Sequence, residues 1–134
     1  MIVGLGTDIV NIGRMERTAE RYGDKFVNKL FTADEKVDIA NADGTSYGRP
    51  AKMARMFAAK EAAAKALGTG FRNGIMWCDI EVKHDKLGRP LLVFYNKALA
   101  KAKKICGGDK FESWLSLSDD YPFAQAVAII EKIS

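Results

Sequence analysis

The sequence contains few of the residues on which disulfide frameworks, zinc sites and nucleophilic triads depend. Two cysteines and one histidine occur among its 134 residues. Cys78 and Cys106 stand alone, without a CxxC pair or a metal-type histidine, so reduced and partly buried thiols are expected. His84 falls near an expected hairpin turn, and no Ser or Cys has the companion His/Asp arrangement of a triad.

Long apolar runs are also missing. The longest run free of charge and proline covers residues 123–130, well short of the roughly 20 residues that a membrane-spanning helix needs. The first residues lack a basic leader and reach Asp8 after a short apolar run, so a signal peptide does not fit. We therefore expect a cytoplasmic protein without a membrane partner. No Ser/Pro-rich stretch divides the chain, and residues 1–134 are expected to form one domain.

The charge is only mildly unbalanced. The 21 basic and 17 acidic residues give a net charge of +4, which suits a phosphorylated ligand or an acidic protein at least as well as a nucleic acid. Aromatic platforms of the RNA-binding kind are absent from the sequence, so a nucleic-acid partner is not expected. Hydrophobic residues make up 48% of the chain, enough for a folded core.

Apolar periodicity, caps and glycines predict the order of the secondary structure. Asn11 is a plausible N-cap, Thr32 with Glu35 forms a Thr-x-x-Glu capping box, and Gly44 and Gly48 punctuate a loop before an alanine-rich helix. The expected strands are 2–10, 77–83, 90–95, 113–117 and 123–130, and the expected helices are 11–22, 25–30, 33–42, 51–67 and 96–106. This order favours an α+β fold over a parallel α/β sheet.

Asp8 is the first candidate for chemistry, because it is a carboxylate in an otherwise apolar strand that includes Ile9 and Val10. A carboxylate there is costly to desolvate unless it is paired, hydrogen-bonded or bound to a metal. The simpler alternative is that Asp8 caps the helix that follows the strand.

Glu61 is the second candidate. Phe57, Glu61 and Lys65 are spaced at i, i+4 and i+8, so they form one row on the surface of the long helix. A solvated Glu–Lys pair, which contributes only about 0.2 to 0.5 kcal/mol, would also explain this spacing. Small alanines surround the row, and Gly68 begins a glycine-rich loop that carries Arg72. This loop follows a helix and does not open one, so the P-loop and dinucleotide motifs do not apply.

Basic residues recur at helical spacing in two places. On the first helix they form a positive stripe, along which an acidic helix could dock, although solubility alone would also explain it. At the start of the long helix they meet free backbone amides, a combination that favours phosphate, with a solvated face as the alternative. The stripe consists of Arg14, Arg17 and Arg21, and the second group of Arg49, Lys52 and Arg55.

Two longer strings combine these candidates. GLGTDIV at residues 4–10 contains a G-x-D signature, and FAAKEAAAKALGTG at residues 57–70 contains F-x-x-K-E-x-x-x-K. The two strings, in this order and in a chain of this length, resemble those of the short phosphopantetheinyl transferases of the holo-acyl-carrier-protein synthase family. The resemblance extends through residues 79–82, 87–90 and 115–119. It implies the fold of that family, with a mainly antiparallel sheet packed on a long central helix.

The resemblance implies a reaction. The family transfers 4′-phosphopantetheine from coenzyme A to a serine of apo acyl carrier protein, with adenosine 3′,5′-bisphosphate as the other product, in support of fatty acid synthesis. Mg²⁺ would be the cofactor, with Asp8 and Glu61 as its protein ligands. Either Glu61 or a water molecule on the metal would take the serine proton. Lys65, one turn beyond Glu61, would stabilise or protonate the leaving phosphate.

The resemblance also implies partners. The stripe of Arg14, Arg17 and Arg21 would contact acidic acyl carrier protein. Family members of this length resemble homotrimers with active sites between neighbouring subunits and coenzyme A in the cleft. Asp8 and Glu61 could then come from one chain and the stripe from the next. Residues expected to bind coenzyme A are Arg49, Lys52, Arg55, Gly68, Gly88, Arg89 and Pro90, the last three in a turn that resembles the segment near the adenine end.

Two positions depart from the family pattern, and both would touch the nucleotide end. Met56 stands where many members carry Arg, and Asp119 stands where many carry His. Arg55 is one residue from the first position, but a shift of one residue rotates a side chain by about 100° around a helix. These departures leave the metal pair intact and affect the contacts to the 3′-phosphate.

Two other functions fit parts of the same pattern. A magnesium-dependent nucleotide hydrolase could use the same two carboxylates and would cleave coenzyme A without any carrier protein. A non-catalytic basic module could bind an acidic protein or RNA through the arginine stripe, in a manner sensitive to salt and indifferent to Mg²⁺.

Overall fold

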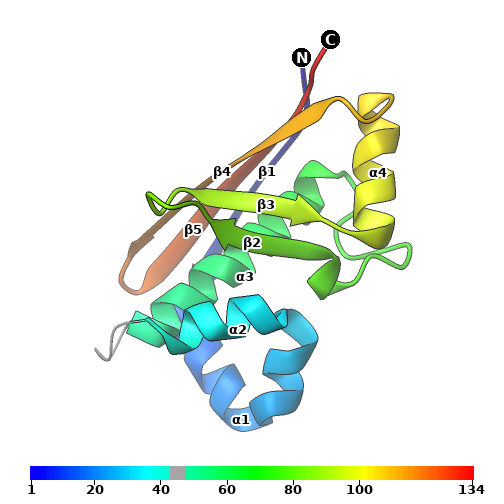
Figure 1. Cartoon of the computed structure of the whole chain (residues 1–134). Helices are drawn as coiled ribbons and strands as arrows, with labels where there is room; N and C mark the ends of the chain where they lie inside the picture. The colour runs from blue at the N-terminus through cyan, green and yellow to red at the C-terminus, as the bar shows by residue number, and fades with distance from the viewer. Residues whose placement is uncertain (43–47) are drawn as a thin grey trace.

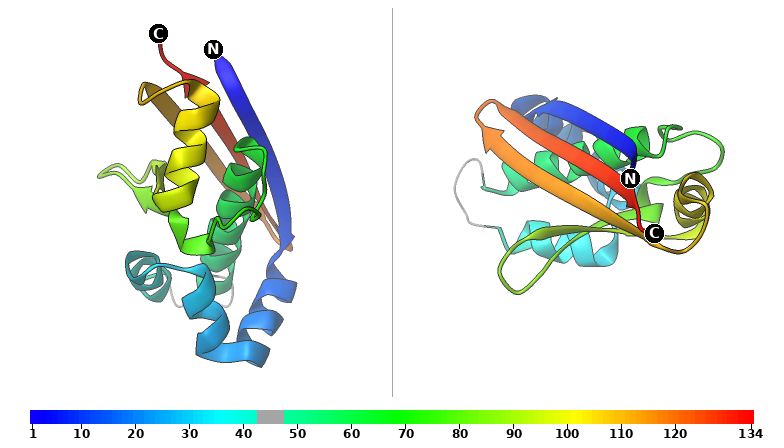
Figure 2. Two further views of the ribbon diagram at one scale, coloured as in Figure 1. Left: turned by 90° about the vertical axis from the view of Figure 1, so that its right-hand side faces the viewer. Right: turned by 90° about the horizontal axis from the view of Figure 1, so that it is seen from above.

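The long alanine-rich helix is the element around which the others are arranged. In the computed structural model, which describes residues 1–42 and 48–134, it runs between a three-stranded sheet and a two-stranded hairpin (Figures 1 and 2). The elements are β1 (Ile2–Asn11), α1 (Ile12–Leu30), α2 (Ala33–Ala40), α3 (Gly48–Ala66), a 3-10 helix η1 (Trp77–Asp79), β2 (Ile80–His84), β3 (Pro90–Phe94), α4 (Asn96–Cys106), β4 (Phe111–Asp120) and β5 (Phe123–Lys132).

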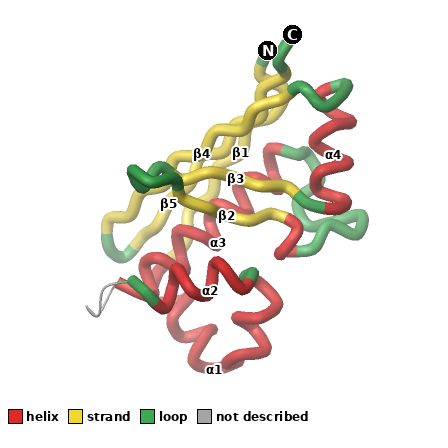
Figure 3. The backbone as a smooth tube through the Cα atoms, viewed as in Figure 1, coloured by secondary structure: helices red, strands yellow, loops and turns green. Residues whose placement is uncertain are grey.

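Both sheets are antiparallel, as predicted. The larger has the order β1-β5-β4, and the smaller is the hairpin β2-β3. β5 is therefore the central strand of its sheet although it comes last in the chain, and Asp8 of β1 stands opposite Ala126 of β5. Figure 3 shows these strands together, with α4 at one side. The α+β class and the sheet packed on a long helix are confirmed.

Small residues let α3 lie very close to the larger sheet. The residues of β5 that face the helix include Ala124, Ala126 and Ala128, all with no exposed area. On β1 the close approach requires glycine: a Cβ at Gly4 would overlap the carbonyl oxygen of Ala66, and one at Gly6 that of Ala62. The two glycines of the GLGTDIV string thus lie where a strand backbone meets a helix backbone.

The opposite face of this sheet is covered by no helix of the described residues (Figure 2). We call it the outer sheet face. Several large apolar side chains are exposed on it, and the strand register places them on the same side of the sheet. Their exposed fractions are 62% for Leu5, 63% for Ile9, 43% for Trp114 and 47% for Phe123.

The helical boundaries agree with the caps read from the sequence. The Asn11 side chain accepts from the backbone N–H of Arg14, and the Thr32–Glu35 capping box is present. Gly23, with φ of +63° and ψ of −149°, breaks α1 where the sequence predicts one helix to end and another to begin. Gly48 is the first residue of α3, which corrects its assignment to a loop, while Gly44 lies outside the described residues.

One predicted strand begins too early. Residues Trp77–Asp79 form a 3-10 turn and not the start of β2, because the Asp79 carboxylate accepts from the backbone N–H of Met76 at 2.9 Å and closes the chain into a turn. The two C-terminal strands are longer than predicted and pair along their whole length. Among the described residues, no helix is both long and apolar enough to span a membrane.

Candidate functional site

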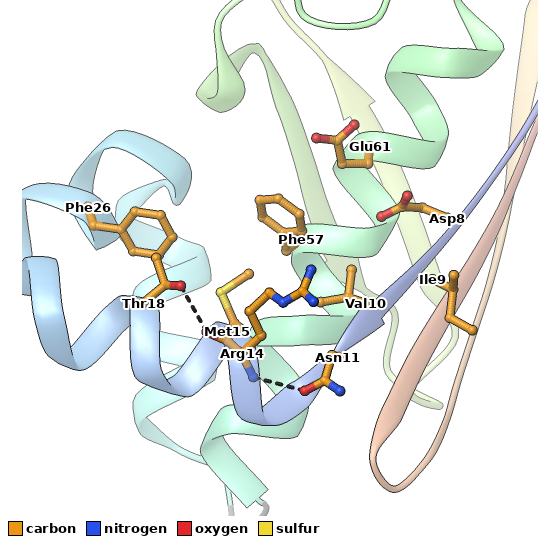
Figure 4. Close-up of a pocket in the computed structure, with 10 residues that line it drawn as sticks. All are labelled: Asp8, Ile9, Val10, Asn11, Arg14, Met15, Thr18, Phe26, Phe57 and Glu61. Carbon is orange, nitrogen blue, oxygen red and sulfur yellow. Dashed lines mark hydrogen bonds between the residues drawn. The ribbon is translucent and has the colours of Figure 1, made fainter.

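Two carboxylates from different elements face the same pocket. Asp8 comes from β1 and Glu61 from the middle of α3, and both point to the same side of the helix (Figure 4). The pocket has a volume of about 440 Å³. The capping role considered for Asp8 belongs to Asn11, whose Oδ1 accepts from the backbone N–H of Arg14 at 2.9 Å. Asp8 therefore does not cap the helix, and its side chain lines the pocket instead.

The environment of Glu61 disfavours its charge. Burial raises the pKa of the Glu61 carboxyl above its ordinary value, the negative charge of Asp8 raises it further, and the positive charge of Lys65 opposes both. A cation between the two carboxylates would relieve both the lost hydration and the repulsion.

Lys65 reaches across to β1. Its Nζ lies 3.2 Å from Oδ1 of Asp8 and donates to the carbonyl oxygen of Thr7 at 2.9 Å. The alternative of a Glu61–Lys65 surface pair is thus not the arrangement observed, because the ammonium is held by the strand. About half of the Lys65 side chain, 52%, stays exposed and open to a ligand.

The rest of the pocket is largely apolar and includes one residue of the arginine stripe. Arg14 extends into it from α1 (Figure 4), and its carbonyl oxygen accepts from Oγ1 of Thr18 at 2.8 Å. Arg17 and Arg21 are exposed further along α1, outside this lining, as a stripe on a helix surface should be. The other lining residues are Ile9, Val10, Asn11, Met15, Phe26 and Phe57.

The residues expected to bind coenzyme A lie outside this pocket in the same chain. Arg49 lines a separate hollow of about 310 Å³ beside α2. Gly68 follows the end of α3, and Gly88, Arg89 and Pro90 lie at the turn and start of the β2-β3 hairpin, where the Arg89 guanidinium is 5.2 Å from the ring centroid of Trp114. Lys52 and Arg55 are on the first half of α3.

The two departures from the family pattern have clear structural positions. Met56 is buried in the core, so the residue before Phe57 points inward and offers nothing to a nucleotide. Arg55 forms an ion pair with Asp119 at 2.6 Å, with about a third of each side chain exposed. The Arg55 guanidinium is therefore already paired with a carboxylate of the same chain.

The two carboxylates suit a hard cation. Mg²⁺ prefers oxygen ligands and is commonly held by one or two carboxylates together with substrate phosphates. Among the described residues, no group of three or more His, Cys, Asp or Glu side chains could hold a metal ion. Asp8 and Glu61 would therefore supply two ligands and leave the remaining positions to phosphate oxygens and water. The donor set fits Mg²⁺.

Reasoning from the sequence overlooked part of the site. The sequence assigns no role to Phe57, yet it lines the pocket and stacks on Trp77 at 5.1 Å between ring centroids. Its place one turn before Glu61 was the available signal. Lys60, inside the F-x-x-K-E signature, was given no role, although it is fully buried and ion-paired with Glu35.

Comparison with known proteins gives consistent matches along the chain. Residues 4–126 match the family model described as the 4′-phosphopantetheinyl transferase superfamily. A holo-[acyl-carrier-protein] synthase of Paramagnetospirillum magneticum is 46% identical over 98% of this chain and 97% of that protein. The solved holo-[acyl-carrier-protein] synthase of Neisseria meningitidis superposes with a TM-score of 0.82 at 36% identity, covering 98% of this chain and 100% of the other.

A second solved relative carries a ligand. The holo-(acyl-carrier-protein) synthase of Bacillus anthracis, described as a complex with CoA (3′,5′-ADP), has a TM-score of 0.78 and 32% identity over 99% of both chains.

An antiparallel sheet packed on a long helix, with two carboxylates facing one pocket, is an arrangement that could hold a hard cation against phosphate groups. The chain belongs to the 4′-phosphopantetheinyl transferase superfamily. Within it, the resemblance to the holo-acyl-carrier-protein synthases is confirmed by relatives of that name that match over nearly their full length.

Proposed function

We propose that this chain transfers the 4′-phosphopantetheine group of coenzyme A to a serine of apo acyl carrier protein, releasing adenosine 3′,5′-bisphosphate, in support of fatty acid synthesis. The observation that carries the proposal is the pairing of Asp8 with Glu61 in one pocket, in a chain of this superfamily. The names of its relatives support the same substrates. We also propose that residues 1–134 act as one domain in the cytoplasm.

Mg²⁺ is the proposed cofactor, and Asp8 and Glu61 are its proposed protein ligands. When bound, the ion would neutralise the charge that develops on the phosphates. We also propose that the proton of the serine hydroxyl is accepted either by Glu61 or by a water molecule in the pocket. Lys65, held beside Asp8 and half exposed, would stabilise or protonate the leaving phosphate.

The arginine stripe is the proposed docking site for acyl carrier protein. Arg14 lines the pocket that contains Asp8 and Glu61. Arg17 and Arg21 extend the positive surface along α1. Complementary charge of this kind mainly speeds encounter and sets the orientation of the partner. An acidic helix lying along α1 would bring its serine towards Glu61.

A homotrimer with active sites between subunits is supported by the outer sheet face. Large apolar residues are exposed there without cover, a property that usually marks an interface. Ile9 lies on this face and also lines the Asp8–Glu61 pocket. It lines two further hollows, one with Lys65 and Gln125 and one with Asp119. A neighbouring copy packed on the outer sheet face would complete the rim of the pocket.

The same assembly would explain the positions of the coenzyme residues. Within one chain they lie away from Asp8 and Glu61, so we propose that they reach the pocket of a neighbouring subunit. The residues are Arg49, Lys52, Arg55, Gly68, Gly88, Arg89 and Pro90.

The proposal is tested by mass spectrometry of apo acyl carrier protein after incubation with coenzyme A, with and without Mg²⁺. We expect a gain of one phosphopantetheine group that requires Mg²⁺ and is lost in Glu61→Ala and Asp8→Ala. Asp109→Ala, at an exposed carboxylate between α4 and β4 and outside the pocket, is the matched control and should keep full activity. No mass gain in the unchanged protein would refute the proposal, and cleavage of coenzyme A without carrier protein would favour a hydrolase.

A further inference from the structure

A buried ion pair outside the pocket joins α3 to α2. Lys60 directly precedes Glu61, and its Nζ lies 2.7 Å from Oε1 of Glu35, with both side chains fully buried. Lys60 also donates to the carbonyl oxygens of Trp77 at 3.1 Å and Ile80 at 2.6 Å. An ammonium group has three donors, so these three acceptors use all of them.

Glu35 is equally committed to fixed partners. Its Oε1 also accepts from the backbone N–H of Thr32 at 2.9 Å, which completes the capping box of α2, and its Oε2 accepts from the backbone N–H of Val82 at 2.8 Å. Removing either member of the pair would leave a buried charge without its counter-ion. Directional bonds from two side chains thus connect α2, α3, η1 and β2.

The place of Lys60 in the helix gives this pair a geometric consequence. Successive residues of an α-helix point about 100° apart, so Lys60, Glu61 and Ala62 face three different directions. Ala62 carries the carbonyl oxygen against which Gly6 of β1 packs. Glu61 therefore lies between one side of α3 that is fixed by β1 and another that is fixed by Lys60.

We propose that the Lys60–Glu35 pair is an anchor that fixes the rotation of α3 about its axis and thereby holds Glu61 opposite Asp8. Lys60 is then a positioning residue, which acts through Glu61 and touches no substrate. The inference rests on the proposed function, because it takes Asp8 and Glu61 to hold one metal ion together. Two carboxylates share an ion only while both reach it, so a turn of α3 would weaken metal binding in a protein that is still folded.

The test measures metal binding apart from catalysis. Mn²⁺ can be titrated into the protein without coenzyme A or carrier protein and followed by electron paramagnetic resonance. In Lys60→Met we expect the Mn²⁺ affinity of the folded protein to fall by about 10-fold or more, the usual effect of losing a residue that orients a metal ligand. The Mg²⁺ concentration needed for half-maximal transfer should rise by a similar factor, and excess Mg²⁺ should recover part of kcat.

A control separates positioning from loss of stability. Phe94→Ala opens the core where Phe94 meets Phe111, at 6.4 Å between ring centroids, and removes no hydrogen bond to α3. Both variants are assayed well below their own unfolding temperatures. The Phe94→Ala protein should bind Mn²⁺ as the unchanged protein does.

A milder variant keeps the inference testable if Lys60→Met does not fold. Glu35→Gln keeps the size of the side chain and one oxygen for Lys60, but it turns an amide N–H₂ towards the N–H of Val82 and so loosens the anchor. Its Mn²⁺ affinity should fall by a smaller factor. Unchanged affinity in either folded variant would overturn the anchor. Equal Mn²⁺ binding by the unchanged protein and Asp8→Ala would instead show that the metal pair itself is wrong, and the anchor would fall with it.

Discussion

At the scale of single residues, Glu61 is held in a state that is useful for binding a cation and unfavourable without one. Burial, followed by the charge of Asp8, raises its pKa from the ordinary value of 4.5. A carboxyl whose pKa is raised by folding stabilises the protein fully below its unfolded pKa, and this contribution is lost as the pH rises through the folded pKa. The metal-free protein therefore carries a destabilising charge at neutral pH.

Glu61→Gln should accordingly stabilise the metal-free protein at pH 7 while abolishing transfer. We expect an unfolding temperature that is higher by up to a few degrees in the presence of a chelator, with the difference vanishing below about pH 4.5. Thermal unfolding at pH 7 and pH 4 measures this difference, with Asp109→Asn, at a mostly exposed carboxylate, as the control. An unfolding temperature at pH 7 equal to or below that of the unchanged protein would contradict this reading of the site.

Gly6→Ala should be strongly destabilising, because the added Cβ meets backbone and not a movable side chain. The carbonyl oxygen of Ala62 would have to shift together with α3, which we expect to cost about 1–3 kcal/mol or more. Urea unfolding gives the value. The matched control is Gly13→Ala, where the nearest atom is Nη1 of the flexible Arg17 at 3.2 Å, and the change should stay within about 0.5 kcal/mol. Similar costs for both would refute the close backbone approach.

The partner of Lys65 shows what the sequence could and could not predict at this scale. Helical periodicity correctly places Phe57, Glu61 and Lys65 in one row, since it depends only on the local pitch of the helix. The ion pair with Asp8 depends on β1 lying alongside α3, which the packing of glycines against backbone carbonyls decides. Periodicity within one element carries no information about that contact.

At the scale of elements, a second carboxylate ties the hairpin to α2. Glu81 of β2 is buried and accepts hydrogen bonds from Thr32 and from Tyr95, and Lys83 lies 3.5 Å away. Burial alone would raise the pKa of Glu81, but these hydrogen bonds and the charge of Lys83 outweigh it, so the pKa is lowered. The stabilisation is present above the unfolded pKa of 4.5 and is lost as the pH falls through the folded value.

Glu81→Gln should therefore lower stability at pH 7, by about 1.5–3 kcal/mol as expected for hydrogen bonds to a charged group. The difference from the unchanged protein should shrink as the pH falls below 4.5. Denaturant unfolding over this pH range measures it. Asp34→Asn, which removes the mostly exposed partner of Lys83, is the control and should change stability by less than about 1 kcal/mol. A difference in unfolding free energy between Glu81→Gln and the unchanged protein that stays constant with pH would contradict this prediction.

Elements defined by local chemistry were predictable, and those that depend on a single side-chain contact were less so. The capping box of Thr32 and Glu35 correctly predicts the start of α2, because both bonds form within one turn. The apolar, β-prone residues at Trp77 favour a strand, yet the bond from the Met76 N–H to Asp79 makes a 3-10 turn. β-propensity measures the fit to a sheet surface and does not register such a bond.

At the scale of the whole molecule, the outer sheet face makes the oligomeric state testable. Leu5→Glu places a charge on the apolar outer sheet face. It should convert a trimer into monomers and abolish transfer, as light scattering after size exclusion and the mass assay would show. Val37→Glu, at a similarly exposed apolar residue of α2, should leave the assembly and the activity unchanged. A monomeric unchanged protein, or an assembled Leu5→Glu, would exclude this interface.

The strand order β1-β5-β4 also has a consequence for the timing of folding during synthesis. The central strand is made after both of its neighbours, so β1 cannot form its hydrogen bonds in the sheet until β5 has been synthesised. Closing so long a loop is slow compared with forming local contacts. Asp8 is fixed by pairing opposite Ala126 of β5. A nascent chain in which α3 and Glu61 have already left the ribosome therefore still lacks a fixed Asp8. The site of Asp8 and Glu61 can therefore be complete only after β5 has been synthesised.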